Sequence, residues 1–489
     1  MQEVGFACAS GFKFSPILGV ASRSSSKCAT SKSVSEGGRS TRRDTSLDVS
    51  WIARPRLRCG LVWAFALPGT FAAPVSILQS VRLVTRSDDG YVARPMIEPS
   101  PFIDESSLLR ALRASPFLFD EIARAKPSEK ETHLQQRLRD KFPVEMVVAA
   151  LTLLDIRRKA AASQKFSRAD QLWLTPTGLE QATAEPVARH KARRFEGPVW
   201  DYCCGIGGDS LALAERCDVH SVDLDPAMCL RTEWNAEVYG VRERIQTLVA
   251  DVSQPSDHTG LLHIDPDRRP GGRQRMMRIE DCSPNLDVLR TLMSQFRGGA
   301  IKLSPASNFG GKFTNVEIEL VSLHGECKEA TIWFGDLAGD QPFRATSLPS
   351  GESIAADPMS ARVDIVPTRA FVFDPDPAIV RTGLLDVLAE RMQLARLDDA
   401  EEYLTGDQPL VSPWMQTFRV LEVIPNNERE VRAACRRFGF GSVEIKCRHL
   451  PIDVERVRRK LPLEGSRPGV LLFARVLGKA QVIVAERAV

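Results

Sequence analysis

The sequence has no C-x-x-C pair and no strong excess of charge of one sign. Its 11 cysteines are spread over 489 residues, and only Cys203 and Cys204 are adjacent. Zinc sites and disulfide frameworks depend on closely spaced or paired cysteines, so we expect no bound metal and no disulfide framework. A reducing, cytoplasmic setting is the simplest expectation. Lys and Arg number 65 and Asp and Glu 62, and the net charge of +3 neither indicates nor excludes a nucleic-acid partner.

The composition also lacks extremes. Hydrophobic residues make up 43% of the chain and charged residues 26%, which are ordinary values for globular proteins. This excludes a mostly disordered, collagen-like or coiled-coil protein. A chain of this length has room for several domains, each with a buried core.

Residues 1–95 differ from the rest, because they hold 13 Lys and Arg against 6 Asp and Glu. Residues 1–50 are rich in Ser, Arg and Gly, which predicts disorder. The uncharged run 59–81 contains two prolines and lies far from the N-terminus, which is not typical of a signal peptide. No Met lies between Met1 and Met96. We therefore predict a disordered leader or an extension from a misplaced translation start, with a targeting segment or a membrane anchor as alternatives.

Residues 96–196 are predicted to form a helical segment. Ser106 and Ser107 are N-cap candidates before a periodic apolar stretch, and Pro143 suits the first turn of a later helix. Basic residues follow, and they indicate either a solvated face or a lid that grips substrate. They are Arg157, Arg158, Lys159, Lys165, Arg168, Arg189, Lys191, Arg193 and Arg194.

Short apolar stretches alternate with helical patterns over residues 197–340, which indicates parallel strands joined by helices. Acids stand at or close after the ends of the first four stretches: Asp201, Asp223, Asp251 and Asp265. In a doubly wound sheet these strand ends share one edge, where ligands bind. Residues 316–321 and 330–334 then predict an antiparallel pair at the end of the domain.

The first strand runs into a glycine turn, Gly205-Ile206-Gly207-Gly208, and then into a helix. The third glycine of a dinucleotide fingerprint is missing, because position 210 is Ser. An acid at Asp201 would repel a pyrophosphate but could pair with the ammonium of an amino-acid-like ligand. This arrangement favours S-adenosylmethionine. Asp223 would accept hydrogen bonds from the ribose hydroxyls, and Asp251-Val252 could accept from the adenine amino group.

These four ordered motifs resemble class I S-adenosylmethionine-dependent methyltransferases. The resemblance implies that the cofactor, S-adenosyl-L-methionine, binds along the strand ends. The residues implied are Asp201, Cys203, Gly205, Gly207, Asp223, Leu224, Asp251 and Val252. Cys203 and Cys204 could also suggest a thiol nucleophile, but their apolar neighbours favour buried, inert thiols.

In amine-directed members of this family an acid, two prolines and an aromatic often end the fourth strand. Here Asp265 and Pro266 agree with that pattern, while the second proline and the aromatic are absent. Asp265 and Pro266 are therefore the catalytic candidates, and Asp265 would orient the acceptor. Arg268 and Arg269 could hold a phosphate backbone or stand in a solvated loop. Lys302 is a further substrate candidate, although strand alternation could equally turn it away.

The C-terminal residues 365–489 read as an α/β module, in which Pro377 precedes a helix over Ile379–Met392, Asn426-Asn427 caps a second helix and Asp453 caps a short third one. Residues 429–460 contain 10 Lys and Arg against 4 Asp and Glu, which indicates either a solvated positive face or RNA docking. The stretches 373–381, 444–448 and 458–461 resemble the THUMP-like domain that follows the methyltransferase core in a family of bacterial proteins. Its resemblance to RNA-binding THUMP domains implies a tRNA or rRNA partner.

The predicted fold class is therefore α/β, with a Rossmann-like seven-stranded methyltransferase core over 197–340. An N-terminal helical segment precedes it, a linker or insertion over 341–364 follows it, and a THUMP-like module closes the chain. The expected activity is S-adenosylmethionine-dependent methylation of RNA, without a metal or a membrane. The alternatives are an RNA-association protein that binds the cofactor without catalysis, and a methyltransferase for another substrate.

Overall fold

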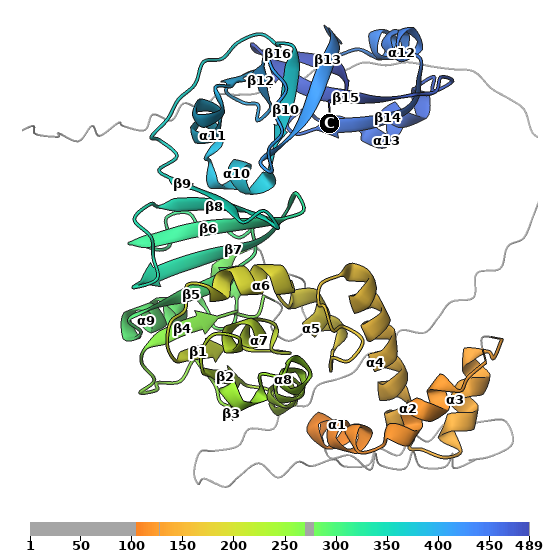
Figure 1. Ribbon diagram of the computed structural model, residues 1–489, viewed down its shortest axis with the longest axis vertical. Helices are drawn as coiled ribbons and strands as arrows, with labels where there is room; N and C mark the ends of the chain where they lie inside the picture. Colours follow the sequence, from red (N-terminus) through yellow and green to blue (C-terminus); the bar gives the residue numbers. More distant parts are fainter. Residues whose placement is uncertain (1–103, 127, 269–277, 489) are drawn as a thin grey trace, which may run out of the picture. The chain divides into compact units, whose positions relative to one another are not determined.

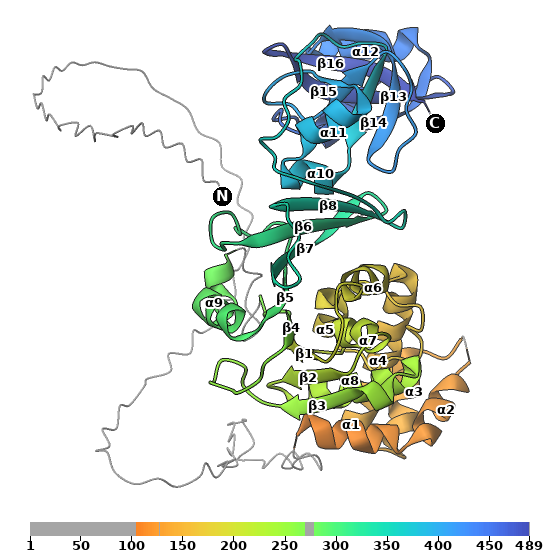
Figure 2. The same cartoon turned by 60° about the vertical axis from the view of Figure 1, so that its left-hand side comes forward.

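A computed structural model describes residues 104–126, 128–268 and 278–488. The predicted leader over 1–95 and Arg269 lie outside the described residues. The described chain starts with helices, continues into a first mixed sheet and ends in a second sheet (Figures 1 and 2). The N-terminal helices are α1 Glu105–Arg113, α2 Pro116–Ala123, α3 Glu131–Arg139, α4 Val144–Ser163, α5 Pro176–Gln181 and α6 Glu185–Ala192.

The start of α1 differs from the expectation. Its N-cap is Asp104, whose carboxylate accepts a hydrogen bond from the backbone N–H of Ser107, so Ser106 and Ser107 lie inside the helix. The Ser107 hydroxyl accepts in return from the backbone N–H of Asp104, which completes a capping box. The apolar stretch is then divided at Ser115, because Pro116 has no N–H and starts a new helix. Pro143 is the N-cap of α4.

The first sheet has strand order β3-β2-β1-β4-β5-β7-β6-β8-β9 in the described residues. The first five strands in this order are parallel, and β7 runs antiparallel to both β5 and β6. This confirms the Rossmann-like order and the reversed strand pair. The strands are β1 Val199–Tyr202, β2 Val219–Asp223, β3 Ile245–Val249, β4 Leu261–Ile264, β5 Gly298–Leu303, β6 Val316–Leu323, β7 Glu326–Gly335, β8 Phe343–Leu348 and β9 Glu352–Ala356.

The residues 341–364, expected as a linker or insertion, contain two of these strands. Phe343–Leu348 pairs in parallel with β6, and Glu352–Ala356 pairs antiparallel with Phe343–Leu348. The sheet therefore extends to nine strands where seven were expected. Ala345, Ile354 and Ala356 are buried, so these strands add to the apolar core. The apolar stretches of these two strands are short and are interrupted by Pro and Ser residues, so the sequence pattern did not predict strands here.

Apolar side chains alternate between the two faces of the parallel strands. Val199 and Leu261 pack on the face covered by α6 and α7 Gly208–Ala214, and Tyr202 and Ile264 pack on the face covered by α9 Leu286–Gln295. The remaining crossover helix, α8 Pro226–Tyr239, contacts β2 and β3. Buried strands of this kind fix the strand ends at one edge, which is where the candidate site lies.

The second sheet has the order β11-β12-β10-β13-β16-β15-β14 in the described chain. The helix expected over Ile379–Met392 is divided at Gly383, whose left-handed φ of 74° ends the first half. The expected caps Asn427 and Asp453 are confirmed. The elements are β10 Phe371–Pro375, α10 Pro377–Thr382, α11 Leu385–Met392, β11 Ala395–Arg396, β12 Leu404–Gly406, β13 Met415–Pro425, α12 Glu428–Arg437, β14 Phe440–Cys447, α13 Val454–Lys460, β15 Arg467–Val476 and β16 Lys479–Arg487.

Candidate cofactor and acceptor pocket

A left-handed glycine turn joins β1 to α7. Gly205 has φ 56° and Gly207 has φ 86°, backbone conformations that favour glycine. A Cβ on Gly207 would lie 3.0 Å from side-chain atoms of Thr232, whereas a Cβ on Gly205 would meet no atom within 4 Å. The turn is thus packed against α8 on one side. At Gly205 it opens into a pocket, where any side chain would take ligand space.

The pocket has a volume of about 550 Å³ and lies along the strand ends of the first sheet. It brings together nearly all residues that the sequence assigned to a cofactor. Those that line it are Asp201, Cys203, Gly205, Asp223, Leu224, Asp251 and Val252, while Gly207 supports the turn from behind. The acceptor candidates Asp265, Pro266 and Arg268 line the same pocket.

Asp223 presents a carboxylate at the end of β2. Its Oδ2 accepts a hydrogen bond from the backbone N–H of Gly205 at 2.8 Å, and its Oδ1 accepts from the backbone N–H of Asp225 at 3.0 Å. Burial raises the pKa of Asp223, and the two backbone hydrogen bonds oppose this rise. These bonds tie the acid to the glycine turn and fix its direction.

Asp251 turns its carboxylate toward the following residues. Oδ1 accepts from the hydroxyl and the backbone N–H of Ser253, at 2.6 and 2.9 Å, and these hydrogen bonds lower the pKa of Asp251. Leu224 is 70% exposed, although it is apolar and lines the pocket. Together with Val252 it offers apolar surface beside the two acids.

Asp201 is more enclosed than the sequence suggested. Its Oδ1 lies 2.6 Å from Nδ1 of His263 on β4, and its Oδ2 accepts a hydrogen bond from the hydroxyl of Ser210 on α7. Asp201 is 1% exposed, so its carboxylate already has two partners beneath the turn. This geometry makes Asp201 a support of the glycine turn as well as a pocket residue.

The thiols next to Asp201 do not suit nucleophilic chemistry. Burial raises the pKa of Cys203, while a hydrogen bond to Cys229 and burial raise the pKa of Cys204. A thiol with a raised pKa is a poor source of thiolate. This agrees with the prediction of inert cysteines.

Asp265 stands at the end of β4, next to a lysine on β5. Nζ of Lys302 lies 2.5 Å from Asp265 Oδ2 and donates to the carbonyl oxygen of Gln181 at 3.0 Å. Removal from bulk water raises the pKa of Asp265, and Lys302 opposes this rise. Lys302 is 7% exposed and does not line the pocket, so the structure turns it toward Asp265 and away from a direct substrate contact.

The N-terminal helical segment forms one wall of this pocket, but not through the basic residues for which a lid was an alternative. Thr175, Thr177 and Gln181, at and on α5, line it, and Nε2 of Gln181 donates to Oδ1 of Asp267 at 3.1 Å. The Thr175 hydroxyl accepts from the backbone N–H of Gly178 as the N-cap. A Thr-Pro helix start was visible in the sequence, but nothing in it linked this helix to the strand ends.

Arg268 also reaches the pocket. Its Nη1 is buried and has no hydrogen-bond partner among the described residues. A buried guanidinium nitrogen with an unused donor calls for an acceptor. This position is therefore suited to an oxygen of a bound ligand.

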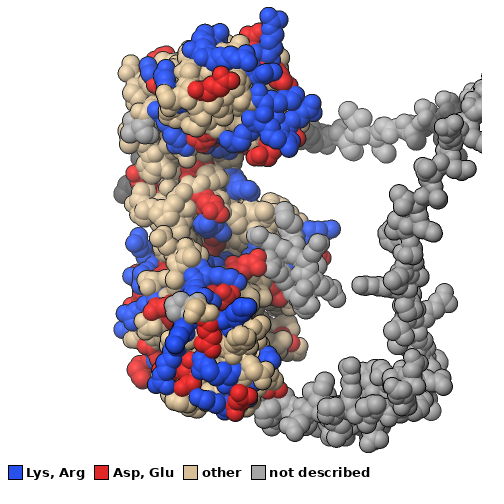
Figure 3. Space-filling view, turned by 90° about the vertical axis from the view of Figure 1, so that its right-hand side faces the viewer, with Lys and Arg blue, Asp and Glu red and all other residues tan. Residues whose placement is uncertain are grey.

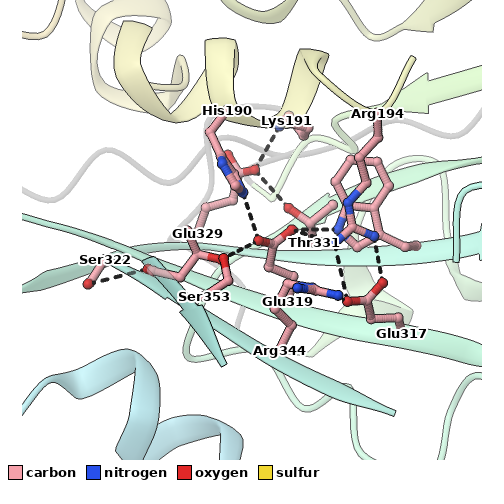
Figure 4. Close-up of polar contacts among 12 residues, drawn as sticks. His190, Lys191, Arg194, Glu317, Glu319, Ser322, Glu329, Thr331, Arg344 and Ser353 are labelled. Atoms are coloured by element: carbon pink, nitrogen blue, oxygen red, sulfur yellow. Dashed lines mark hydrogen bonds and ion pairs between the residues drawn. The ribbon is translucent and has the colours of Figure 1, made fainter. Parts of the chain in front are cut away.

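Behind the pocket, α6 is attached to the sheet by buried ion pairs (Figure 4). His190 and Lys191 of α6, and Arg194 just after it, point toward acids on β6 and β7. Nζ of Lys191 lies 2.7 Å from Glu329 Oε1 and 3.0 Å from Asp209 Oδ1. Two of the basic residues expected on a solvated face or a lid, Lys191 and Arg194, thus hold the helical segment on the core.

Arg194 and His190 complete this network. Arg194 donates two hydrogen bonds to Glu317, at 2.5 and 3.2 Å, and His190 Nε2 lies 2.7 Å from Glu319 Oε1. Burial would raise the pKa of Glu319, but the hydrogen bond to His190 and nearby positive charge lower it to about 2. By contrast, Arg158 and Lys159 pair with Asp155 on an exposed surface, as the solvated-face interpretation predicted.

No helix in the described part of the chain is both long and apolar enough to cross a membrane. Among the same residues, no cluster of three or more His, Cys, Asp or Glu side chains could hold a metal ion.

Comparisons with known proteins agree with this geometry. A family described as RNA cap guanine-N2 methyltransferase matches residues 197–299, and a family described as THUMP domain-like matches residues 415–487. A solved structure of a candidate methyltransferase from Porphyromonas gingivalis W83 has 17% identity and a TM-score of 0.62, covering 79% of this chain and 100% of that one. That likeness shows the fold.

Sequence relatives show more than the fold. An uncharacterized S-adenosylmethionine-dependent methyltransferase occurs in two strains of Mycobacterium tuberculosis, CDC 1551 and H37Rv. Both proteins are 36% identical to this chain over 314 residues, which is 62% of this chain and 85% of the relative. The chain belongs to this family of S-adenosylmethionine-dependent methyltransferases, with a THUMP-like domain at its C-terminus, and its cofactor is S-adenosyl-L-methionine.

Proposed function

We propose that this enzyme methylates an exocyclic amine of guanine in RNA. The observation that carries the proposal is the Asp265 carboxylate, which lies at the end of β4 in the same pocket as the glycine turn. When bound, S-adenosylmethionine supplies a methyl group on a positively charged sulfur. The chain's own residues must then bind the cofactor, place the acceptor amine next to the methyl group and keep other nucleophilic atoms of the base away from it.

The pocket residues suit the cofactor. The glycine turn leaves open space at Gly205, which suits the methionine portion. Asp223 would accept hydrogen bonds from ribose hydroxyls, and Asp251 would accept from the adenine amino group. Leu224 and Val252 supply apolar surface for the adenine ring.

Replacing Asp223 with Ala should weaken S-adenosylmethionine binding about tenfold or more, because charge-assisted hydrogen bonds to the ribose are lost. The measurement is calorimetric titration of the full chain. Asp218→Ala is the matched control, because Asp218 is exposed and stands just before β2, away from the strand ends. Equal affinities in all three proteins would refute the role of Asp223.

The acceptor side of the pocket favours guanine. The ionised carboxylate of Asp265 can only accept hydrogen bonds, and guanine offers adjacent donors, N1–H and the N2 amine. Adenine and cytosine each present an acceptor beside the amine, so they would need a protein donor next to Asp265. Nη1 of Arg268, which has no hydrogen-bond partner within the described ranges, could donate to the guanine O6 or to a phosphate oxygen.

The methyl transfer asks for a free lone pair on the acceptor nitrogen. An N–H of the amine donated to Asp265 would orient that lone pair toward the methyl group. A nitrogen–carbon bond forms as the sulfur–carbon bond breaks, and the amine then loses one proton to Asp265 or to water. The products are the methylated base and S-adenosylhomocysteine.

RNA as the substrate is supported by the two family matches and by the surface of the C-terminal domain. Arg429 and Arg436 on α12, and Arg456 and Arg459 on α13, are exposed and form no ion pair with any described residue. We call these four residues the C-terminal basic patch. In Figure 3, Lys and Arg side chains gather over the C-terminal domain at the top of the view. Such unpaired charges suit phosphate oxygens of tRNA or rRNA.

RNA binding should weaken steeply with salt, because each phosphate contact releases counterions. Replacing both Arg456 and Arg459 with Gln should reduce the slope of log affinity against log salt by about 2. Filter binding with tRNA over a range of salt concentrations measures this slope. The control is Arg362→Gln, an exposed arginine that pairs with Asp399 outside the patch. Identical slopes for all proteins would show that the C-terminal basic patch does not contact the phosphates of the RNA.

Transfer of a tritiated methyl group to total RNA tests the function itself. Label in guanine of RNA supports the proposal, whereas label only in protein or small molecules contradicts it. One observation favours a non-catalytic, cofactor-binding RNA-association protein: no aromatic side chain is among the pocket-lining residues of the described chain, so base stacking is weak. Strong cofactor binding without any labelled product would establish that alternative.

A further inference from the structure

We infer that Lys302 is a positioning residue, which keeps Asp265 ionised and aimed at the acceptor amine. This inference rests on the proposed function of Asp265. It assigns to Lys302 a role that acts through Asp265 and involves no contact with the substrate.

The strand register places the two residues side by side. Ile264 of β4 pairs with Ile301 of β5, so the next residues along these parallel strands, Asp265 and Lys302, are neighbours. The Lys302 ammonium has three hydrogens, and two of them have clear acceptors in Asp265 Oδ2 at 2.5 Å and the Gln181 carbonyl at 3.0 Å. The third side of the ammonium faces Asp209 Oδ2 at 3.9 Å. These contacts come from three separate parts of the fold, so the ammonium is held in one place.

The charges around Asp265 show why a cation is needed. Asp209 on α7 adds a second negative charge, while Lys302 on β5 and Lys191 on α6 add positive charge. The charge of Lys165, which follows α4, also interacts electrostatically with Asp265 and Lys302. A further carboxylate, Asp267, follows two residues after Asp265 in the chain. Lys191 is shared between Asp209 and Glu329, so among the residues that the structure describes Lys302 is the cation in direct contact with Asp265.

The protonation state of Asp265 decides which hydrogen bond it can make. A carboxylate accepts an N–H from the amine and leaves the nitrogen lone pair free. A protonated carboxyl group can donate to that lone pair and block the transfer. Because partial burial favours the protonated form, the ammonium of Lys302, in direct contact with Asp265 Oδ2, shifts the balance back toward the carboxylate form.

The test compares pH profiles of methylation by full-length Lys302→Met and Lys302→Arg with the parent enzyme. In Lys302→Met the acid limb of the log kcat profile should move to higher pH by about one unit or more, so that activity falls about fivefold or more at the parent's midpoint and recovers at higher pH. Lys302→Arg, which retains the charge, should keep the parent midpoint. Lys328→Met is the matched control, because Lys328 is exposed and pairs with Glu326 on β7. A purely structural defect would instead lower the rate by one factor at every pH, and that result would overturn the inference.

A second measurement does not depend on turnover. In protein labelled with ¹³C at the aspartate carboxyl carbons, the Asp265 signal is identified by its loss in Asp265→Asn. Its titration midpoint should rise in Lys302→Met, and an unchanged midpoint would overturn the inference. Asp209→Asn provides an independent variant, because loss of this neighbouring negative charge should move the midpoint downward; an upward shift or none would count against the inference.

The outcomes also separate this inference from the proposed function. Full activity in Asp265→Asn would remove the proposed role of Asp265, and the inference about Lys302 with it. An inactive Asp265→Asn combined with a parent-like pH profile in Lys302→Met would remove only the inference. Calorimetric S-adenosylmethionine affinity close to that of the parent confirms that each variant is folded.

Discussion

Asp265→Asn should lower the methylation rate about 100- to 1000-fold while S-adenosylmethionine affinity changes less than about twofold. The amide keeps the shape of the side chain but loses the negative charge. It also brings an N–H₂ donor, which competes with the acceptor amine for orientation. We therefore expect kcat to fall while cofactor affinity is retained, since the glycine turn and Asp223 are left intact.

Single-turnover methylation of tRNA or rRNA measures the rate, and calorimetry measures cofactor affinity. Asp257→Asn is the matched control, because Asp257 is exposed in the loop before β4. A parent-like rate in Asp265→Asn would show that the acceptor is oriented by other residues. A large loss of cofactor affinity would instead place Asp265 in the cofactor site.

The second large effect concerns stability. Lys191→Met should lower the free energy of unfolding by about 3–5 kcal/mol, because it leaves buried carboxylates without their cation. Burial alone would lower the pKa of Lys191, but Asp209 and Glu329 raise it above its usual value. The side chain is 2% exposed, so water cannot replace the missing charge.

Urea unfolding of the full chain measures this loss. Lys159→Met removes the same side chain from an exposed pair with Asp155, and no measurable change is expected there. An equal loss in both variants would show that the buried network of Figure 4 contributes no more than a surface pair.

The stability that Lys191 contributes should also depend on pH in a defined direction. Burial would raise the pKa of Asp209, but Lys191 lowers it below its usual value, so the stability from this pair is present above the unfolded pKa near 3.8. It is lost as the pH falls, because protonation removes the charge that Lys191 pairs with. The difference between the parent and Lys191→Met should therefore be largest near neutral pH and should narrow below about pH 4.

Much of the site could be read from local patterns. Acids after buried strands, a glycine turn before a helix and the spacing to Asp223 all depend on neighbouring residues in the chain. Parallel strands must bring their carboxyl ends to one edge, so the predicted doubly wound sheet already implied that Asp223, Asp251 and Asp265 meet in one pocket. The caps Asn427 and Asp453 were likewise local and were confirmed.

The sequence by itself thus determined the parallel strands, the fold class and the acids at the pocket edge. Tertiary structure alone decided which buried charges pair. It placed Lys302 in contact with Asp265 and Asp201 in contact with His263. It also placed α5 against the pocket and buried Lys191 between two acids. The physical reason is that periodicity and turn chemistry act over a few residues, whereas an ion pair depends on which distant side chains the packing of helices and strands brings within a few ångströms.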